Sequence, residues 1–272
     1  MGSRTFADIP RHVHAATGIL TQRFLRRGPS ISRLFDMVAI ESVLYQIFLV
    51  ETDLWTNPTA SDGGLEVDFW LQAEKLLNHL TLSPDQSIAL DSPVLGIPVS
   101  LFRLALALRQ QYRSPSPLAC EEIRTEVEAW EAILFCNPTS ESCCGSTEET
   151  LDSNQRYNND TTSLFIIVVS LLLEQVLHPD MCVGPPIPAS QGCWQITKAM
   201  DILRHYESDQ GWAKYFIANW PVYTLGFFLT NDEDKVLLSE DMQRRWDETR
   251  FAQVRRFRSD LDTTWGLYSH PV

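Results

Sequence analysis

The chain has 272 residues, of which 44% are hydrophobic and 21% charged, a composition typical of globular proteins and not of disordered ones. Its formal net charge of -13 repels phosphate backbones, so we expect no specific binding of DNA by this chain. The longest apolar run, residues 164–173, is shorter than the about 20 residues that cross a bilayer, so we expect no membrane partner.

The first 33 residues differ in charge from the rest of the chain. They hold six arginines and one acid, a net charge of +5, which leaves -18 for the remainder. Such a segment is typical of a basic amphipathic helix with a solvated face, and less so of a mitochondrial transit segment. We therefore separate a basic N-terminal segment, residues 1–29, from one domain over residues 30–272.

Helical periodicity dominates that domain. Residues 30–50 carry apolar side chains near a period of 3.6, which predicts a helix with a buried stripe of Leu34, Val38, Leu44, Ile47 and Phe48. Residues 98–111 are apolar nearly all round, so we place this helix centrally in the core. Residues 121–135 form the clearest amphipathic pattern, with Ile123, Val127, Trp130 and Leu134 on one stripe.

The second half of the chain contains two marked loops and a final helix. Residues 137–158 are polar and predict a long loop, and residues 178–192 contain four prolines, which exclude a regular helix. Phe251, Val254, Phe257, Leu261 and Trp265 then recur at spacings of three and four, before Gly266. The sequence predicts an all-α fold, a single large domain of about eight to ten helices.

Motifs for catalysis or metal binding are not found. The glycines match neither a phosphate loop nor a dinucleotide fingerprint. His12 and His14 would point to nearly opposite faces of a helix, and the six cysteines include no pair at CxxC spacing. We therefore predict no catalytic residue, no metal site and no cofactor.

Two charged segments each allow alternatives. Asp232, Glu233 and Asp234 follow an aromatic stretch, as the magnesium-binding acids of a terpene cyclase would, but we favour a helix cap with acids in its first turn. Six arginines between residues 244 and 258 alternate with acids. A solvated helix face with salt bridges is favoured over a nucleic-acid contact, and an acidic partner groove is a third alternative.

Four stretches occur in an order that carries a family resemblance. They are "AIESVLYQIFLVETDLW" (residues 39–55), "LDSPVLGIPVSLFRLALAL" (residues 90–108), "YFIANWPVYTLGFFLTNDED" (residues 215–234) and "MQRRWDETRFAQVRRFRSDLDTTW" (residues 242–265). Together they resemble the C-terminal regulatory domain of fungal zinc binuclear cluster transcription factors, the second type of fungal-specific transcription factor domain.

This resemblance implies a bent core helix at Trp220 and Pro221. Proline would bend the axis, and Gly226 would let another helix approach closely. By analogy with sterol-sensing members, the bent helix could also wall a pocket for an apolar ligand. The ligand-binding candidates are then Trp220, Tyr223 and Phe227.

The function implied is that of a non-catalytic regulatory domain or protein of fungal transcription, located in the nucleus. Its partners would be the transcription machinery or another regulator, together with an apolar ligand, and a homodimer is compatible with this role. The family's DNA-binding module needs six cysteines near the N-terminus, whereas the first cysteine here is Cys120. The chain is then either part of a longer factor or a stand-alone relative. The alternative function is a helical enzyme or small-molecule-binding protein of fungal secondary metabolism.

Overall fold

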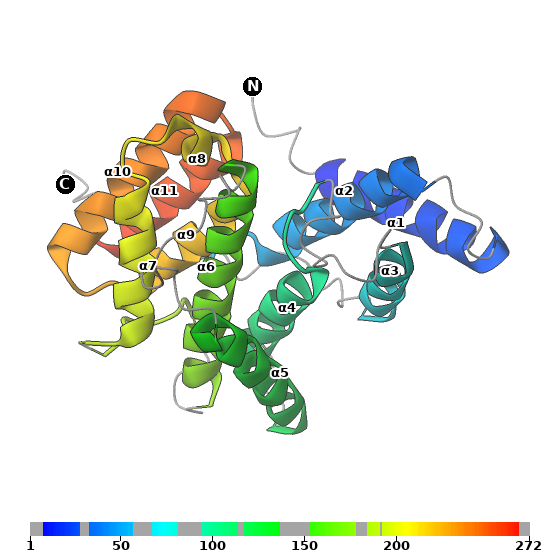
Figure 1. Ribbon diagram of the computed structural model, residues 1–272, viewed down its shortest axis with the longest axis horizontal. Helices are drawn as coiled ribbons and strands as arrows, with labels where there is room; N and C mark the ends of the chain where they lie inside the picture. Colours follow the sequence, from blue (N-terminus) through cyan, green and yellow to red (C-terminus); the bar gives the residue numbers. More distant parts are fainter. Residues whose placement is uncertain are drawn as a thin grey trace, which may run out of the picture. The chain divides into compact units, whose positions relative to one another are not determined.

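Every regular element in the described part of the chain is helical. The computed structural model describes residues 8–27, 33–56, 67–80, 94–113, 117–136, 153–177, 184–190 and 192–266. Within these ranges there are eleven α-helices, two short 3-10 helices and no strand (Figure 1). The predicted all-α class is confirmed. The chain divides into two compact units, Met1–Asp53 with Thr59–Leu106 (unit 1) and Leu54–Pro58 with Ala107–Val272 (unit 2). The predicted boundary after residue 29 stays a prediction.

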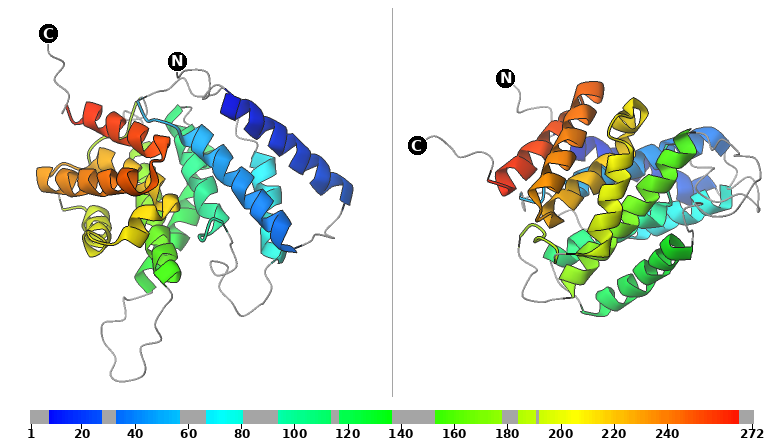
Figure 2. Two further views of the ribbon diagram at one scale, coloured as in Figure 1. Left: turned by 90° about the horizontal axis from the view of Figure 1, so that it is seen from above. Right: turned by 60° about the vertical axis from the view of Figure 1, so that its left-hand side comes forward.

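Unit 1 is built around α2. It contains α1 (Asp8–Arg27), α2 (Arg33–Thr52), α3 (Val67–Leu80) and residues 99–106 of α4 (Val99–Arg113), and α2 packs against both α1 and α3 (Figure 2). The rings of Phe48 and Phe102 meet edge to face at 4.9 Å. The predicted buried stripe is wrong in part, because Val38 is 37% exposed while Met37 and Ile40 are buried. Since α2 is apolar on most sides, its period alone does not fix the buried face.

A buried carboxylate holds the segment that precedes α4. Glu41 of α2 is 2% exposed, and its Oε2 accepts hydrogen bonds from the backbone N–H groups of Val94 (2.8 Å) and Leu95 (3.0 Å). A backbone N–H that is buried, as at Leu95, needs a hydrogen-bond partner within the protein, and the carboxylate supplies it. Glu41 therefore joins the first and second stretches of the family resemblance.

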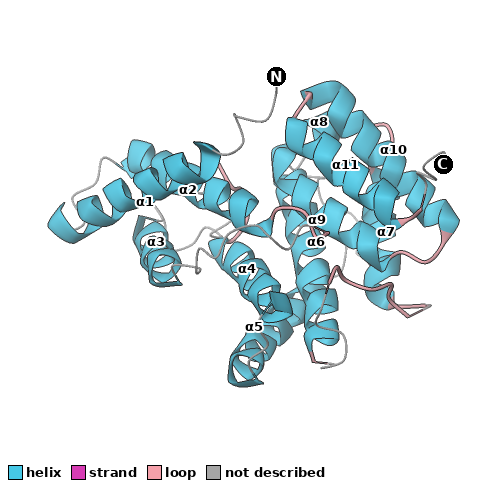
Figure 3. Cartoon of the chain, turned by 180° about the vertical axis from the view of Figure 1, so that it is seen from behind, coloured by secondary structure: helices cyan, strands magenta, loops and turns pink. Residues whose placement is uncertain are grey.

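Unit 2 surrounds α6 (Ser153–Val176), which packs against α5 (Pro117–Cys136), α7 (Trp194–His205) and α9 (Asn219–Leu225) (Figure 3). Three more helices complete the described part of this unit: α8 (Gln210–Lys214), α10 (Asp232–Thr249) and α11 (Ala252–Thr264). By length and composition α6 could cross a membrane, but 72% of its apolar window is buried inside the protein. A mostly buried core helix meets the same criteria of length and composition.

The predicted loop over residues 137–158 is wrong at its end, because α6 begins at Ser153. Tyr157 explains the extension. It is 8% exposed, and its ring lies 5.6 Å from that of Tyr206 and 6.1 Å from that of Trp212. The polar composition of this segment hides its one large apolar contact, so tertiary packing extends the helix beyond its local preference. Residues 137–152 lie outside the described part.

The Trp-Pro segment is the buried centre of unit 2. A 3-10 turn (Phe216–Ala218) precedes α9, and another (Gly226–Phe228) follows it. The chain therefore passes from 3-10 to α-helical geometry and back again. Pro221 is the third residue of α9, in the first turn, where its missing N–H needs no intrahelical acceptor. Each residue of α9 is buried. The proline therefore marks the start of α9 instead of freeing a carbonyl within a longer helix.

Gly226 allows α11 to approach the Trp-Pro segment, as predicted. A Cβ atom there would lie 2.7 Å from Leu261 Cδ2 and 3.3 Å from Trp265 Cζ2, and the indole N–H of Trp265 donates to the Gly226 carbonyl at 3.1 Å. The glycine therefore has no room for a side chain.

We expect Gly226→Ala to lower the free energy of unfolding by about 1–3 kcal/mol, because the added methyl group overfills the contact with Leu261. Urea denaturation would measure the change. Gly18→Ala in α1 is the matched control. A Cβ atom at Gly18 has no neighbour within 4 Å, so alanine there should stabilise by about 0.5–1 kcal/mol. Equal effects at both sites would contradict this interpretation.

Candidate functional site

The three residues predicted to bind an apolar ligand lie in packed core. Trp220, Tyr223 and Phe227 are 1%, 0% and 2% exposed. Trp220 packs against Phe165 at 5.6 Å between ring centroids, and Phe227 meets Tyr223 edge to face at 5.4 Å. None of the three lines the cavity found in this unit. Their part in ligand binding stays a prediction, and their contacts account for their burial.

The Tyr223 hydroxyl is the centre of a buried hydrogen-bond network. It accepts from the backbone N–H of Trp55 at 2.8 Å and donates to Asp260, which also accepts from Thr56. The indole N–H of Trp55 donates to Thr224 at 3.2 Å. The network fixes residues 54–56 against α9 and α11 and satisfies polar groups that burial would otherwise make costly.

A second set of contacts holds the Trp55 ring. The guanidinium of Arg109 lies 3.8 Å from the centre of the indole and donates to the Leu54 carbonyl at 2.6 Å. Tyr223, whose hydroxyl accepts from the Trp55 backbone, is held in turn by Phe257, on which its ring stacks at 4.0 Å with an interplanar angle of 3°. Sequence reasoning identified the aromatic residues and missed Arg109 and Asp260 as their polar partners.

Four tyrosines make the stability of unit 2 sensitive to alkaline pH. Burial is the first cause that raises the pKa of Tyr157, Tyr206, Tyr215 and Tyr223, and the Asp260 carboxylate adds to it at Tyr223. In the unfolded chain these phenols ionise at about pH 10. Above that pH the unfolded state binds fewer protons than the native state, so stability is fully present below about pH 10 and falls as the pH rises further.

We therefore expect urea midpoints to decrease above about pH 10, with phenolate absorbance appearing together with unfolding. Tyr223→Phe should make this decrease shallower, since it removes one of the shifted groups. Urea midpoints that stay constant as the pH rises from about 9 to about 12 would contradict the expectation.

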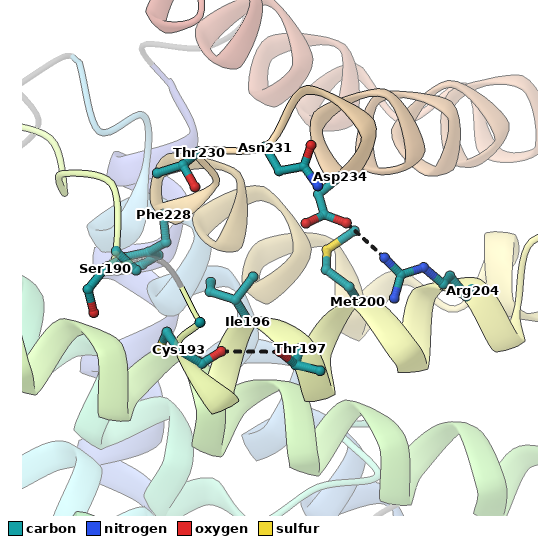
Figure 4. Close-up of a pocket in the computed structure, with 12 residues that line it drawn as sticks. Ser190, Cys193, Ile196, Thr197, Met200, Arg204, Phe228, Thr230, Asn231 and Asp234 are labelled. Atoms are coloured by element: carbon teal, nitrogen blue, oxygen red, sulfur yellow. Dashed lines mark hydrogen bonds and ion pairs between the residues drawn. The ribbon is translucent and has the colours of Figure 1, made fainter.

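A groove of about 400 Å³ lies between α7 and the segment that joins α9 to α10 (Figure 4). α7 contributes Ile196, Thr197, Met200 and Arg204, which recur at spacings of one helical face. Phe228, Thr230, Asn231 and Asp234 form the opposite wall, and the lining also includes Ala189, Ser190, Gly192 and Cys193.

Local backbone contacts set the walls of this groove. Ala189 donates from its N–H to the Phe228 carbonyl at 2.9 Å, which ties the proline-rich segment to the end of the Trp-Pro segment. Gly192 has φ +83°, a left-handed conformation that suits glycine, and it leads into α7. Asn231 caps α10, since its side-chain oxygen accepts from Glu233 N at 3.0 Å. The groove is therefore bounded by backbone held in place at both walls.

The groove has one charged end. Arg204 donates to Asp234 at 2.9 Å and to Asp201 at 3.0 Å. Asp234 lies in the first turn of α10 together with Asp232 and Glu233. Asp201 is not among the residues that line the groove, so the charged groups of the lining are one guanidinium and one carboxylate joined in an ion pair.

The predicted helix cap at residues 230–234 is confirmed. Asn231 is the cap, and all three acids follow in the first turn, where the helix dipole favours negative charge. Among the described residues no group of three or more His, Cys, Asp or Glu is placed to hold a metal ion. The acids of this turn are therefore accounted for by helix capping and by the ion pair with Arg204.

Much of the arginine-rich segment forms salt bridges, as predicted. Arg250 pairs with Asp247 at 3.3 Å, and Arg258 lies 3.9 Å from Asp262. Arg245 is the exception to the predicted solvated face. Its side chain is 0% exposed, and its Nε donates to the equally buried Asp241 at 2.6 Å. The spacing alone could indicate the i,i+4 pair but not its burial, because α10 is predominantly polar.

No family model matches the chain, and neither a curated protein nor a solved structure matches it. The family resemblance therefore stays a prediction from the four sequence stretches alone. Sequence reasoning missed the groove as well. The sequence feature that best indicates the groove is the spacing of Ile196, Met200 and Arg204 in α7, which places two apolar residues and one charged residue on one helical face.

Proposed function

We propose that this chain is a non-catalytic regulatory domain of fungal transcription, acting in the nucleus and responding to a small molecule with an apolar body. The observation that carries the proposal is that the four stretches of the family resemblance pack against one another. Residues that define the resemblance are therefore partners in the same cores.

In unit 1 the first and second stretches meet where Glu41 accepts from Val94 and Leu95. In unit 2 the first stretch ends at Trp55, whose N–H donates to Tyr223 of the third. The third and fourth stretches meet where Gly226 has no space for a Cβ atom beside Leu261.

This packing supports a structural role for the shared residues and leaves ligand recognition to side chains outside the core. The groove between α7 and the segment that joins α9 to α10 meets that requirement through Ile196, Thr197, Thr230 and Asn231, which are exposed or partly exposed above the buried Met200 and Phe228. We place the ligand there and not at the buried Trp220. The partners of the domain are then the transcription machinery or another regulator. They respond to whether the domain has its ligand bound.

A reporter experiment tests this proposal. The full chain is fused to a heterologous DNA-binding domain in a fungal host, and transcription is compared with that of the DNA-binding domain alone. We expect a several-fold change in reporter output. A Gly226→Leu fusion should lose that change, because it disrupts the contact with Leu261 on which the fold depends.

An unchanged reporter with a folded nuclear fusion would contradict the proposal. Turnover of a small molecule by the purified chain would instead favour the alternative, an enzyme of secondary metabolism.

A further inference from the structure

We infer that an exposed surface of unit 2 binds an arginine-bearing segment of a partner protein. This surface, which we call the aromatic-acidic surface, consists of the ring pair Phe135 and Trp194 and the carboxylates Glu128, Glu131 and Glu174. It is formed by α5, α7 and α6, on which both of the others pack (Figure 1). The inference deepens the proposed function by naming the chemistry of its partner, and it depends on that function for its biological role.

The two rings contact each other and are open to solvent. Phe135 is 60% exposed and Trp194 is 36% exposed, with 4.9 Å between their ring centroids. They come from the end of α5 and the start of α7, so they form one apolar surface across two helices. A partner that covers them gains free energy, because apolar area leaves water on binding.

Two carboxylates of α5 lie on the same side of that helix as Phe135. Glu131 is four residues before Phe135, and Glu128 is three residues before Glu131. Side chains at these spacings are neighbours on one helical face. Negative charge therefore borders the exposed ring of Phe135.

Two buried side chains hold Glu131 and Glu174 in place. Ser170 and Gln195 are each 2% exposed, and the Ser170 hydroxyl donates to Glu131. The Gln195 amide donates to Ser170 Oγ at 3.3 Å and to Glu174 Oε1 at 2.5 Å. Gln195 directly follows Trp194, so these hydrogen bonds tie both carboxylates to the aromatic pair. The acceptors are therefore fixed before a partner arrives, which lowers the entropic cost of binding.

The aromatic-acidic surface carries an excess of negative charge. Lys198 contributes one positive charge, with its Nζ 6.0 Å from the centre of the Phe135 ring. Arg124 also lies on this side of α5, but it is paired with Glu121 at 3.1 Å. Among the described residues, none of the three carboxylates of the surface forms an ion pair. Three carboxylates against one ammonium group attract a cationic partner.

Arginine suits both parts of this surface. Its planar guanidinium lies on aromatic faces and donates in a fork to carboxylates. The chain itself shows the first arrangement, since Arg109 lies 3.8 Å from the centre of the Trp55 indole. Neither Phe135 nor Trp194 lines the cavity found in this unit. An open surface of this kind fits a polypeptide segment better than a small molecule, because small-molecule sites are concave.

Fluorescence anisotropy with three labelled peptides of one sequence tests the inference. Each peptide carries two leucines and, at three positions, arginine, lysine or neutral citrulline. At low salt we expect the arginine peptide to bind about tenfold more tightly than the citrulline peptide, because only the former makes charge-assisted hydrogen bonds. Added salt should reduce that ratio. The lysine peptide should bind about threefold more weakly than the arginine peptide, since an ammonium group lacks the planar fork.

Two substitutions on the surface have matched controls elsewhere in unit 2. Glu174→Gln keeps an acceptor for Gln195 and removes the charge, so it should weaken the arginine peptide about threefold and leave the citrulline peptide unchanged. Phe135→Ala should weaken the arginine peptide about fivefold, because it removes one of the two rings. The controls are Glu240→Gln on α10 and Phe251→Ala before α11, which change exposed side chains outside the surface and should leave binding intact.

The inference is overturned if the arginine and citrulline peptides bind equally, if neither binds, or if the surface variants bind like their controls. It is also overturned if the wild-type chain self-associates and Phe135→Ala abolishes the association, because a second copy would then cover the surface. The peptide titration and the reporter experiment are independent measurements, so failure of the partner chemistry is distinguishable from failure of the regulatory function.

Discussion

Replacing Trp220 with alanine is expected to lower the free energy of unfolding by about 3–5 kcal/mol, the usual range for a buried aromatic side chain truncated to a methyl group. The indole is 1% exposed and packs on Phe165 of α6 at 5.6 Å. Because every residue of α9 is buried, the surrounding structure has little freedom to close the cavity. Thermal and urea denaturation would measure the loss.

Trp194→Ala is the control for this substitution. Trp194 is 36% exposed at the start of α7, so its truncation should cost about 1 kcal/mol or less. A Trp220→Ala protein with wild-type stability and altered reporter output would contradict the core assignment. It would make Trp220 a functional contact, as the family resemblance allowed.

The sequence was sufficient to predict the elements whose apolar residues recur on one face. α11 illustrates this, since Val254, Phe257 and Leu261 are buried at the predicted spacings and Gly266 follows with φ +70°. The first residue of the predicted stripe is wrong, because Phe251 precedes α11 as its N-cap and is 42% exposed. Amphipathic periodicity identifies both the helix and its buried face in such cases. The role of Gly226 was also predictable, because a glycine within an aromatic stretch indicates a close approach.

Elements of uniform composition were less predictable. α2 is apolar on most sides, and so Met37 and Ile40 are buried where Val38 was expected. The first residues of α6 are polar on most sides, and only the contacts of Tyr157 show why they are helical. In both cases the deciding contacts are with residues distant in the sequence.

The candidate site could not be predicted as a site, because it depends on three segments that meet only in the fold. Each segment has a local explanation: Ala189 and Ser190 follow a run of prolines, α7 is an amphipathic helix, and residues 228–234 contain a helix cap. The pairing of Arg204 with Asp234, 30 residues apart, brings them into one groove. No local periodicity indicates this contact.

The buried pair of Asp241 and Arg245 should be the second large determinant of stability. Both side chains are 0% exposed, and Arg245 also donates to the Tyr215 carbonyl at 3.0 Å and to Asn219 Oδ1 at 3.1 Å. Tyr215 precedes the 3-10 turn that leads into α9, and Asn219 is the first residue of α9, so Arg245 holds the start of the Trp-Pro segment against α10. Its guanidinium also lies 4.9 Å from the centre of the Trp212 ring.

We expect Asp241→Leu to lower the free energy of unfolding by about 3–5 kcal/mol, because it leaves the Arg245 charge buried without its carboxylate. Arg245→Met should also destabilise, through the loss of the bonds to Tyr215 and Asn219, although Arg244 still donates to Asp241 at 3.2 Å. The double variant should lose much less than the sum of the two, since neither charge is then left alone in the core.

A double-mutant cycle by urea denaturation measures this coupling, and the exposed pair Asp247 and Arg250 is its control. These side chains are 50% and 65% exposed at 3.3 Å, so Asp247→Leu with Arg250→Met should show a coupling of about 1 kcal/mol or less. A strong coupling at the buried i,i+4 pair and a weak one at the exposed i,i+3 pair would show that a local ion pair alone does not give Arg245 its importance. Additive single effects at Asp241 and Arg245 would contradict that conclusion, because two buried groups that depend on each other cannot be lost independently.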